Sequence, residues 1–317
     1  MLADSVSIVH LLSRARVIAV GAVIVVFANA TLAHAQQLGY KLLGGAGIDA
    51  GVQPPAGLAI IDRVLHYRST ELRGRDGEVV PIDGLDIKAT GMALGASFTT
   101  QLQHETFLTF SLAFPLARLR VNSDQPTASI NGFGFADMFV QPLRVGWRHP
   151  LFDVATAYNV YVPTGKFEPR RGGVGAGHWT HQFSLGGALF LDTTRTGRLS
   201  AMASYETNTR KRGIDIRRGD LIQIQGGAGV GVAKGLTVGV ASFAMWQVTA
   251  NRGADIPATL RGQWSRAFGV GPEVIAVIPS WSTKIELRIE RELGVKSRPK
   301  GQVIAFNASY LMPRKHR

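Results

Sequence analysis

The sequence predicts an all-β fold, an antiparallel up-and-down transmembrane β-barrel of about 12 strands behind an N-terminal signal peptide. Three observations support this prediction. Long stretches alternate polar and apolar side chains, the connections are short at one end of the strands and long at the other, and the N-terminus carries an export signal. After residue 33 no apolar run approaches the roughly 20 residues that a membrane-spanning helix needs.

The clearest alternation lies at residues 281–293. One parity carries the charged residues Lys284, Glu286, Arg288, Glu290 and Glu292. The other parity carries Thr283, Ile285, Leu287 and Ile289. Because successive side chains of a strand point to opposite faces, this stretch has one charged face and one apolar face. A soluble barrel would turn the apolar face inward, whereas a membrane barrel would turn it outward against lipid.

Twelve such stretches follow one another after residue 56. They are expected at residues 57–69, 86–100, 105–121, 132–147, 151–162, 178–191, 198–208, 220–233, 236–250, 262–278, 281–293 and 301–312. Lengths of about ten residues or more exceed the usual ~5–6 of globular sheets and match a tilted membrane span.

The connections between these stretches alternate in length. The short ones are residues 101–104, 148–150, 192–197, 234–235 and 279–280. The long, polar ones are residues 70–85, 122–131, 163–177, 209–219, 251–261 and 294–300. Short periplasmic turns and long outer loops are typical of outer-membrane barrels, and an even strand count places both termini at the turn end. This segregation favours a membrane barrel over a soluble lipocalin-like barrel or a two-sheet sandwich.

Residues 1–35 are predicted to form a secretory signal peptide. Arg14 and Arg16 precede an apolar core at residues 17–27, and Ala33-His34-Ala35 is an A-x-A cleavage site. The chain is therefore expected in the outer membrane of a Gram-negative bacterium.

Three further segments complete the predicted organisation. The Gly/Pro-rich residues 36–56 are expected to form either a plug in the lumen or a flexible periplasmic arm. Residues 57–312 form the barrel, and residues 313–317 form a basic C-terminal tail.

Short motifs occur in a fixed order between residues 54 and 310. They are Asp137-x3-Gln141-Pro142-x4-Trp147, Pro163-Thr164-Gly165, Gly175-x-Gly177-His178-Trp179-Thr180-His181-Gln182, Tyr205-Glu206-x-Asn208, Gly219-Asp220, Trp246-Gln247-Val248-Thr249, Gly271-Pro272-Glu273 and Arg291-Glu292. This ordered set resembles the phenol meta-degradation (MetA-pathway) family of outer-membrane β-barrel proteins. The chain departs from the family at Arg218, where Pro is usual, and in the basic tail after Tyr310.

The resemblance implies an outer-membrane barrel that passes or handles hydrophobic or aromatic compounds and is not itself an enzyme of phenol degradation. No catalytic or ligand residue follows from it.

The residues themselves predict no catalytic site, metal site or cofactor. The chain has no Cys, so thiolate metal sites and Cys nucleophiles are excluded. His178 and His181 would face opposite sides of a strand and could not share a metal. Ser204 and Glu206 share one parity, but no His joins them and no Gly-x-Ser-x-Gly motif occurs. The glycines of residues 226–231 are not followed by a helix and do not predict a phosphate loop.

The parity argument gives two sets of candidate site residues. The predicted lumen-lining residues are Asp137, Gln141, Asn159, Gln182, Glu206, Gln223, Gln247, Glu273, Lys284, Glu286, Arg288, Glu290 and Glu292. These side chains would either filter solutes or brace a narrow lumen through ion pairs. The predicted membrane-interface aromatics are Trp147, Tyr158, Trp179, Trp246, Trp264, Trp281 and Tyr310.

The predicted function is a channel for passive passage of small hydrophobic or aromatic compounds, and an enzyme is not expected. The alternative is a structural or adhesion-type barrel without a conducting lumen. Expected partners are outer-membrane lipid and lipopolysaccharide, the solute, and the outer-membrane assembly machinery. The formal charge of +13 suggests contact with polyanions, and the densest basic loop cluster is Arg210-Lys211-Arg212. Nucleic acid is not expected, because the chain is exported and its basic residues do not form one motif.

Overall fold

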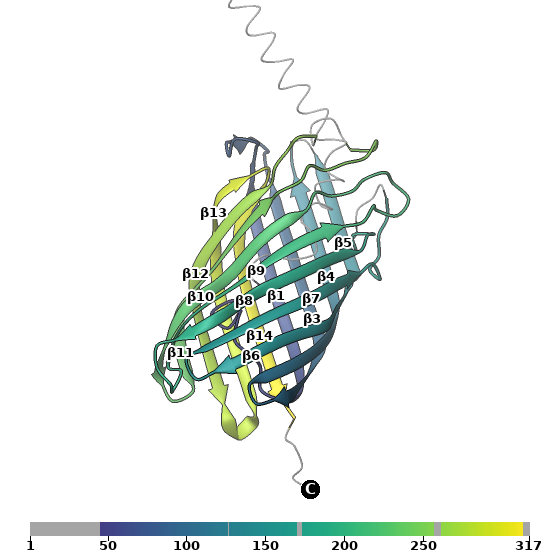
Figure 1. Cartoon of the computed structure of the whole chain (residues 1–317). Helices are drawn as coiled ribbons and strands as arrows, with labels where there is room; N and C mark the ends of the chain where they lie inside the picture. The colour runs from purple at the N-terminus through teal and green to yellow at the C-terminus, as the bar shows by residue number, and fades with distance from the viewer. Residues whose placement is uncertain (1–44, 126, 170–172, 257–260, 313–317) are drawn as a thin grey trace, which may run out of the picture.

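The computed structural model describes residues 45–125, 127–169, 173–256 and 261–312, which form one closed antiparallel sheet (Figure 1). The long strands follow each other around the ring in chain order, and the last pairs with the first. They are β1 (Gly57–Arg73), β3 (Asp86–Gln103), β4 (Thr106–Ser123), β6 (Met138–His149), β7 (Phe152–Val162), β8 (Thr180–Phe190), β9 (Gly197–Asn208), β10 (Leu221–Ala233), β11 (Leu236–Gln247), β12 (Arg266–Ile278), β13 (Thr283–Lys296) and β14 (Arg298–Leu311).

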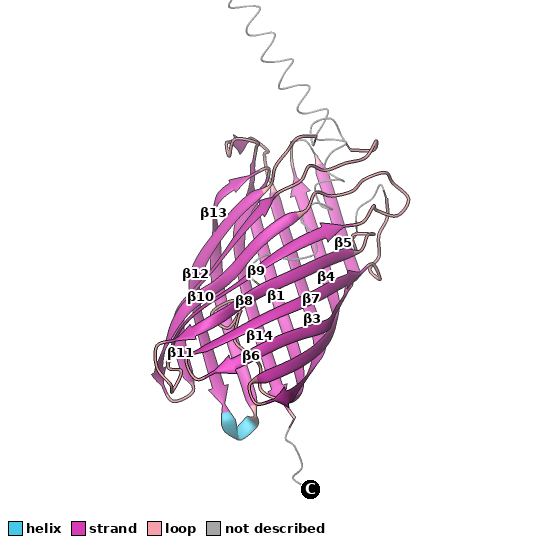
Figure 2. Cartoon of the chain, in the orientation of Figure 1, coloured by secondary structure: helices cyan, strands magenta, loops and turns pink. Residues whose placement is uncertain are grey.

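This ring confirms the predicted all-β barrel of about 12 strands. Two small pieces, β2 (Val79–Val80) and β5 (Ala128–Phe135), pair with β1 and β4 toward the loop end of those strands. Figure 2 shows strands throughout the wall and one short 3-10 turn, η2 (Pro279–Trp281). Within the described ranges, no helix is long and apolar enough to cross a membrane. The predicted signal peptide at 1–35, residues 36–44 and the tail at 313–317 lie outside the described residues.

The two ends of the barrel differ as the sequence predicts. One end carries the five short turns, together with the start of β1 and the end of β14. The other end carries the longer loops, such as the β7–β8 and β9–β10 connections. Two predicted loops are wrong. Residues 128–135, expected as part of a loop and part of a strand at 132–147, form the separate strand β5. Residues 294–300 continue the strands, and Ser297 alone separates β13 from β14. Ser297 has a φ of 53°, which allows a tight turn. The hairpin projects past the apolar band, so its side chains do not need to alternate between polar and apolar.

The outward face of the wall is apolar. Leu94 is 55% exposed, Phe114 is 55% exposed and Leu185 is 62% exposed. On β13, Leu287 is 47% exposed while Arg288 beside it is 1% exposed. The barrel therefore has the orientation of a membrane protein, with the apolar parity of residues 281–293 outward. Asp62 on β1 is an exception, because it shares the outward face with its register partner Leu94.

The predicted interface aromatics lie near both ends of this face. Trp147, Trp281 and Tyr310 are exposed at the turn end. Trp179 and Trp264 are exposed at the loop end, where Trp246 and Tyr158 are half-buried.

Strand β6 departs from simple alternation because it contains a bulge. The register with β7 shifts between Val140 and Leu143, where Pro142 lacks the N–H that a ladder bond requires. As a result Arg144 turns into the lumen, although Gln141 three positions earlier also faces inward. The predicted strand at residues 132–147 therefore does not alternate regularly, because its first residues belong to β5 and the rest carry this bulge.

The outward position of Leu287 generates a first prediction. Leu287→Arg places a charge in the apolar band, which costs about 2–4 kcal/mol near the bilayer midplane. We expect assembly to fail, measured as loss of the heat-modifiable folded band from outer-membrane fractions. Leu287→Ala is the control and should assemble. Normal assembly of Leu287→Arg would show that the faces are reversed.

Candidate functional site: the barrel lumen

The structure places the predicted lumen residues at inward or rim positions. The buried ones are Asp137, Gln141, Asn159, Gln182, Glu206, Gln223, Glu273, Arg288, Glu290 and Glu292. The half-buried ones are Gln247, Lys284 and Glu286. Gln247 lies at the loop end, where its Nε2 donates to the Thr249 carbonyl at 2.9 Å.

Arg288 is the centre of a buried charge cluster. Its Nη1 donates to Glu273 Oε1 at 2.9 Å, and its Nε lies 3.9 Å from Glu290 Oε2. All three side chains are at most 1% exposed. Charges this deeply buried must be paired, because removing one partner leaves an uncompensated charge that costs several kcal/mol. This cluster therefore braces the lumen between β12 and β13.

A second cluster continues the polar wall from β13 to β1. Lys284 Nζ lies 2.6 Å from Glu286 Oε1. Asn307 Nδ2 donates to Glu286 Oε2 at 2.7 Å, and Arg63 Nε donates to Asn307 Oδ1 at 2.8 Å. The chain of contacts ties the three strands β13, β14 and β1 together along the lumen wall.

Several other candidate polar groups are also engaged. Glu292 accepts from the Tyr67 hydroxyl at 3.0 Å and from Arg298 Nη2 at 3.2 Å. Gln182 accepts from Asn159 Nδ2 at 2.8 Å and donates to Glu206 Oε1 at 2.5 Å. These contacts link β1 to β13 and β7 to β9.

The histidines and the acidic residues do not form a reactive centre among the described residues. His178 is buried in the β7–β8 loop, whereas His181 lies on the outward face with its Nδ1 2.7 Å from the Tyr158 hydroxyl. Ser204 and Glu206 both accept from the amide of Gln182. In the ranges described, no group of three or more His, Cys, Asp or Glu side chains could hold a metal ion.

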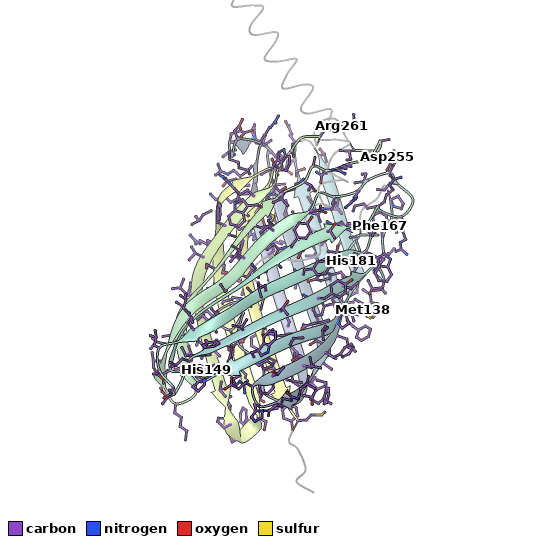
Figure 3. All side chains as sticks on the ribbon, viewed as in Figure 1. Met138, His149, Phe167, His181, Asp255 and Arg261 are labelled. Carbon is purple, nitrogen blue, oxygen red and sulfur yellow. The ribbon has the colours of Figure 1, made fainter. Side chains whose placement is uncertain are left out.

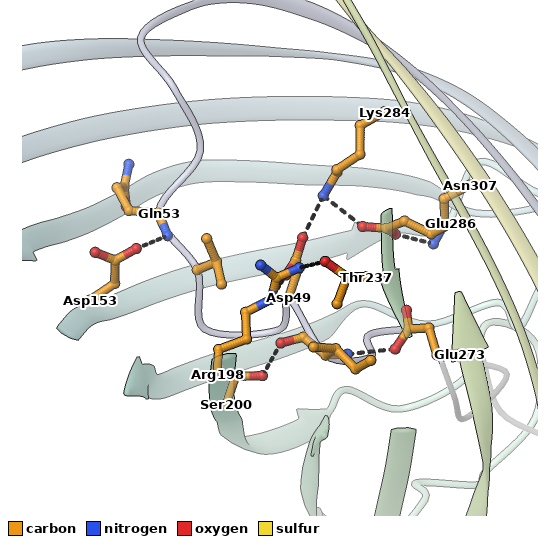
Figure 4. Close-up of polar contacts among 12 residues, drawn as sticks. Asp49, Gln53, Asp153, Arg198, Ser200, Thr237, Glu273, Lys284, Glu286 and Asn307 are labelled. Atoms are coloured by element: carbon orange, nitrogen blue, oxygen red, sulfur yellow. Dashed lines mark hydrogen bonds and ion pairs between the residues drawn. The ribbon is translucent and has the colours of Figure 1, made fainter. Parts of the chain in front are cut away.

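Residues 45–56, the inner segment, lie inside the turn-end half of the barrel (Figure 4). The Ile48 N–H donates to Glu273 Oε2 at 2.6 Å, and the Gln53 N–H donates to Asp153 Oδ2 at 2.9 Å. Arg288 Nη2 donates to the Gly45 carbonyl at 2.9 Å. The wall therefore supplies hydrogen-bond partners that a buried loop needs.

Asp49 anchors the middle of the inner segment by charge. Its carboxylate lies 2.9 Å from Arg198 Nε and 3.1 Å from Lys284 Nζ (Figure 4). These cations come from β9 and β13, so one acidic side chain joins two distant parts of the wall.

Ile48 anchors the same segment by packing. It is 0% exposed, and its side chain rests on inward glycines of β10 and β11. A Cβ built at Gly229 would lie 2.9 Å from Ile48 Cδ1, and one at Gly239 would lie 2.8 Å from it. The glycines at residues 226–231 thus leave room for a side chain rather than for a phosphate.

Two arginines on β6 also hold the inner segment. Arg144 Nη2 donates to the Val52 carbonyl at 2.9 Å, and Arg148 Nη2 donates to the Gln53 carbonyl at 2.5 Å. Sequence reasoning missed both, because the bulge at Pro142 reverses the parity that follows it. The proline in a strand was the available signal. Asp49, Asp153 and Arg198 gave no comparable signal, because their roles depend on where the inner segment lies.

The inner segment leaves one side of the lumen without polar contacts. Within the described residues, its hydrogen bonds and ion pairs to the wall reach β6, β7, β9, β10, β12 and β13. No such contact reaches β14, β1, β3 or β4 in that part of the chain. The inner segment is therefore held against one side of the barrel.

On β3 and β4, the uncovered side has a small and apolar lining, whereas Arg63 and Asn307 make its β1 and β14 part polar. The inward positions of β3 include Ala89, Gly91 and Ala93, and their register partners on β4 are Leu119, Ala117 and Pro115. Most remain half-exposed, unlike the closed charge cluster around Arg288. A Cβ built at Gly91 would meet no atom within 4 Å. Open space therefore lies beside an apolar strip along β3 and β4.

At the loop end, Asp137 holds two parts of the β7–β8 loop together through hydrogen bonds. Its carboxylate accepts from the Gly165 N–H at 2.9 Å and from the Ala176 N–H at 3.0 Å. Burial and nearby Arg218 lower the pKa of Lys211 to about 7, against a smaller opposing effect of Asp137. Burial, Arg218 and Lys211 lower the pKa of His178 to about 3. Figure 3 shows Phe167 at this end, and Lys211 Nζ lies 5.2 Å from its ring centroid.

Comparison with known proteins gives a family and a fold. The family model described as "Putative MetA-pathway of phenol degradation" matches residues 72–308. A search of curated proteins gives no match. The COG4313 outer membrane channel from Pseudomonas putida F1 is similar, with a TM-score of 0.72, 12% identity, and coverage of 82% of this chain and 97% of that chain.

Two autotransporter barrels are more distant. The translocator domain of NalP from Neisseria meningitidis has a TM-score of 0.50 and 13% identity, and covers 90% of this chain and 99% of its own. The transport unit of AIDA-I from Escherichia coli has a TM-score of 0.50 and 9% identity, and covers 90% of this chain and 97% of its own. These likenesses show the fold of an outer-membrane β-barrel, which agrees with the apolar outer face.

The packing of Ile48 against glycine generates a second prediction. Gly229→Val should displace Ile48, because overpacking at such a site costs about 1–3 kcal/mol. We expect a larger ion current in planar bilayers as the inner segment loosens. Gly231→Val is the matched control, because a Cβ there would first meet an atom at 3.5 Å, in ordinary contact. Equal currents for Gly229→Val and wild type would contradict the role of Ile48 packing in holding the inner segment.

The buried lysine generates a third prediction. Lys211 has a folded-state pKa of about 7, below its ordinary value of 10.5. Between these values the unfolded loop binds a proton that the folded loop lacks, so loop stability should rise with pH over this window. Chymotryptic cleavage at Phe167, expressed relative to Lys211→Met at the same pH, should slow by about threefold or more between about pH 7 and pH 10. If the ratio of the wild-type cleavage rate to the Lys211→Met rate does not change with pH, the lowered pKa of Lys211 is refuted.

Proposed function

Since the chain belongs to the family described as the MetA pathway of phenol degradation, we propose that it is an outer-membrane channel for passive passage of small hydrophobic or aromatic compounds. The family match also confirms the resemblance drawn from the sequence motifs. One observation carries the proposal: open space lies beside the apolar strip at Gly91, on the side of the lumen that the inner segment does not contact.

The division of the lumen supports this class of solute. Charged groups around Arg288 are buried and paired, so they offer little to a passing ion. Alanine, leucine and proline side chains on β3 and β4, with the bare backbone of Gly91, offer a surface that an aromatic ring can touch without losing hydrogen bonds. The charged lumen residues then act mainly as braces, and any solute-filtering role falls to half-buried groups such as Lys284, which is 36% exposed.

A barrel without a conducting lumen is the second candidate. The inner segment favours it, because residues 45–53 fill part of the turn-end half through buried contacts with Glu273 and Asp153. The two functions differ in a measurable way, since only the channel raises solute flux.

Outer-membrane lipid and the assembly machinery are the further partners that fit this placement. The sequence predicts that the basic cluster Arg210-Lys211-Arg212 contacts lipopolysaccharide, but the structure buries or pairs part of its charge. Lys211 is buried, and Arg210 lies 3.1 Å from the Asp215 carboxylate. The loop cluster is therefore partly neutralised within the chain.

The apolar strip generates a fourth prediction. Gly91→Leu should fill the open space and lower the uptake of a small aromatic hydrocarbon into lipopolysaccharide-containing proteoliposomes by about half or more. Met92→Leu, one residue away on the outward face, is the control and should match wild type. Wild-type uptake no greater than that of protein-free vesicles would refute the channel and favour the non-conducting barrel.

A further inference from the structure

Four basic side chains form a compact patch on the outward face of β1, β3 and β4. Arg68 pairs in register with Lys88, and Lys88 pairs with Arg120. Arg118 lies two positions from Arg120 on the same face, opposite Thr90. Neighbouring strands lie about 4.8 Å apart, so one row of three cations spans roughly 10 Å. We call Arg68, Lys88, Arg118 and Arg120 the basic patch.

The basic patch lies at the upper edge of the apolar band. On β4 the outward positions before it are Leu108, Phe110, Leu112, Phe114 and Leu116. At about 3.3 Å per residue and a tilt of about 40°, these positions rise by roughly 20 Å, close to the height of a membrane band. Arg118 and Arg120 follow at the next two outward positions. The basic patch therefore lies at lipid-headgroup level on the loop end.

The basic patch has little neutralising charge of its own. Asp86 is its acidic neighbour, with Oδ1 3.3 Å from Arg68 Nε and Oδ2 2.5 Å from Lys88 Nζ. Arg118 and Arg120 are exposed, and within the described residues neither makes a side-chain hydrogen bond or an ion pair. Counting Asp86, the basic patch carries a net charge of three.

This charge arrangement differs from the other clusters of the barrel. The lumen cations Arg288 and Lys284 are paired with carboxylates, and the loop residue Arg217 lies 3.8 Å from Asp220. The basic patch is therefore suited to an external anion. Arginine guanidinium groups bind phosphate through two parallel hydrogen bonds, and a phosphate beside apolar chains matches a patch bordered by Leu116.

We propose that the basic patch binds the lipid A phosphates of lipopolysaccharide in the outer leaflet, with the acyl chains against the apolar band below. The loop end faces this leaflet when the short turns are periplasmic, so the inference rests on the membrane orientation used in the proposed function. It does not depend on solute passage. Anionic phospholipid is the competing source of phosphate, and it is abundant on the opposite side of the membrane.

The test measures lipid affinity in detergent, with the full-length folded protein. Lipopolysaccharide carrying both lipid A phosphates, the same lipid after phosphatase treatment, and phosphatidylglycerol are titrated separately, and lipid-bound protein is followed by native mass spectrometry. Arg118→Gln/Arg120→Gln should weaken binding of the phosphorylated lipopolysaccharide by about tenfold or more. Arg75→Gln/Arg212→Gln removes the same charge from exposed loops and should bind like wild type.

Each outcome decides the proposal. Weakening confined to the patch variant, together with weaker binding of the dephosphorylated lipid by wild type, supports it. Equal weakening in the loop control, or no weakening in the patch variant, overturns it. Equally tight binding of phosphatidylglycerol overturns the assignment to lipopolysaccharide. If the patch variant does not fold, the phosphatase comparison on wild type decides alone. Failed solute uptake with intact lipid binding would refute the channel only.

Discussion

The requirement that lipid imposes on the backbone governs the rest of this structure. Hydrocarbon offers no hydrogen bonds, so a sheet that crosses it must close on itself. Closure is achieved where β14 pairs with β1 over a long register, from Ala59–Leu311 to Arg73–Arg298. Once the ring is closed, each strand has one face toward lipid and one toward the lumen. The outward band and the inward charges are both consequences of that single constraint.

Closure also brings many charged side chains together inside the barrel, where each buried charge needs a partner. Charged residues kept out of lipid are enclosed together in the lumen, and an unpaired charge is costly where they are buried, as around Arg288. Arg288 shows this pairing most clearly, since it is bound to Glu273 and also donates to the Gly45 carbonyl. The inner segment is thus part of the charge balance as well as a partial filling. Asp49, placed between Arg198 and Lys284, extends the same balance to β9.

The fold could be predicted closely from the sequence, and the lumen only in part. Period-two alternation defines strands well because one face must be apolar, as Leu287 and Arg288 show. It fails where polar residues extend past the membrane, as at Ser297, and where a bulge reverses parity, as at Pro142. Period-two alternation cannot predict the contacts of the inner segment. Ile48 packs against Gly229, and these residues lie far apart in the sequence with no local pattern linking them.

The barrel divides its surface by strand as well as by face. Strands β1, β3 and β4 carry the basic patch outside, and β3 and β4 carry the apolar strip inside, whereas β12 and β13 carry the paired charges inside. Near the loop end of this sector, inward Ile87, Leu119 and Val121 pack in a buried cluster. At Gly91 and Ala93 the inward side chains are absent or small, so that stretch depends more on backbone pairing and on what covers its outer face. A rigid phosphorylated lipid held across three of its strands would supply that support from outside. The open sector of the lumen and the lipid-binding sector of the surface are then two sides of the same strands.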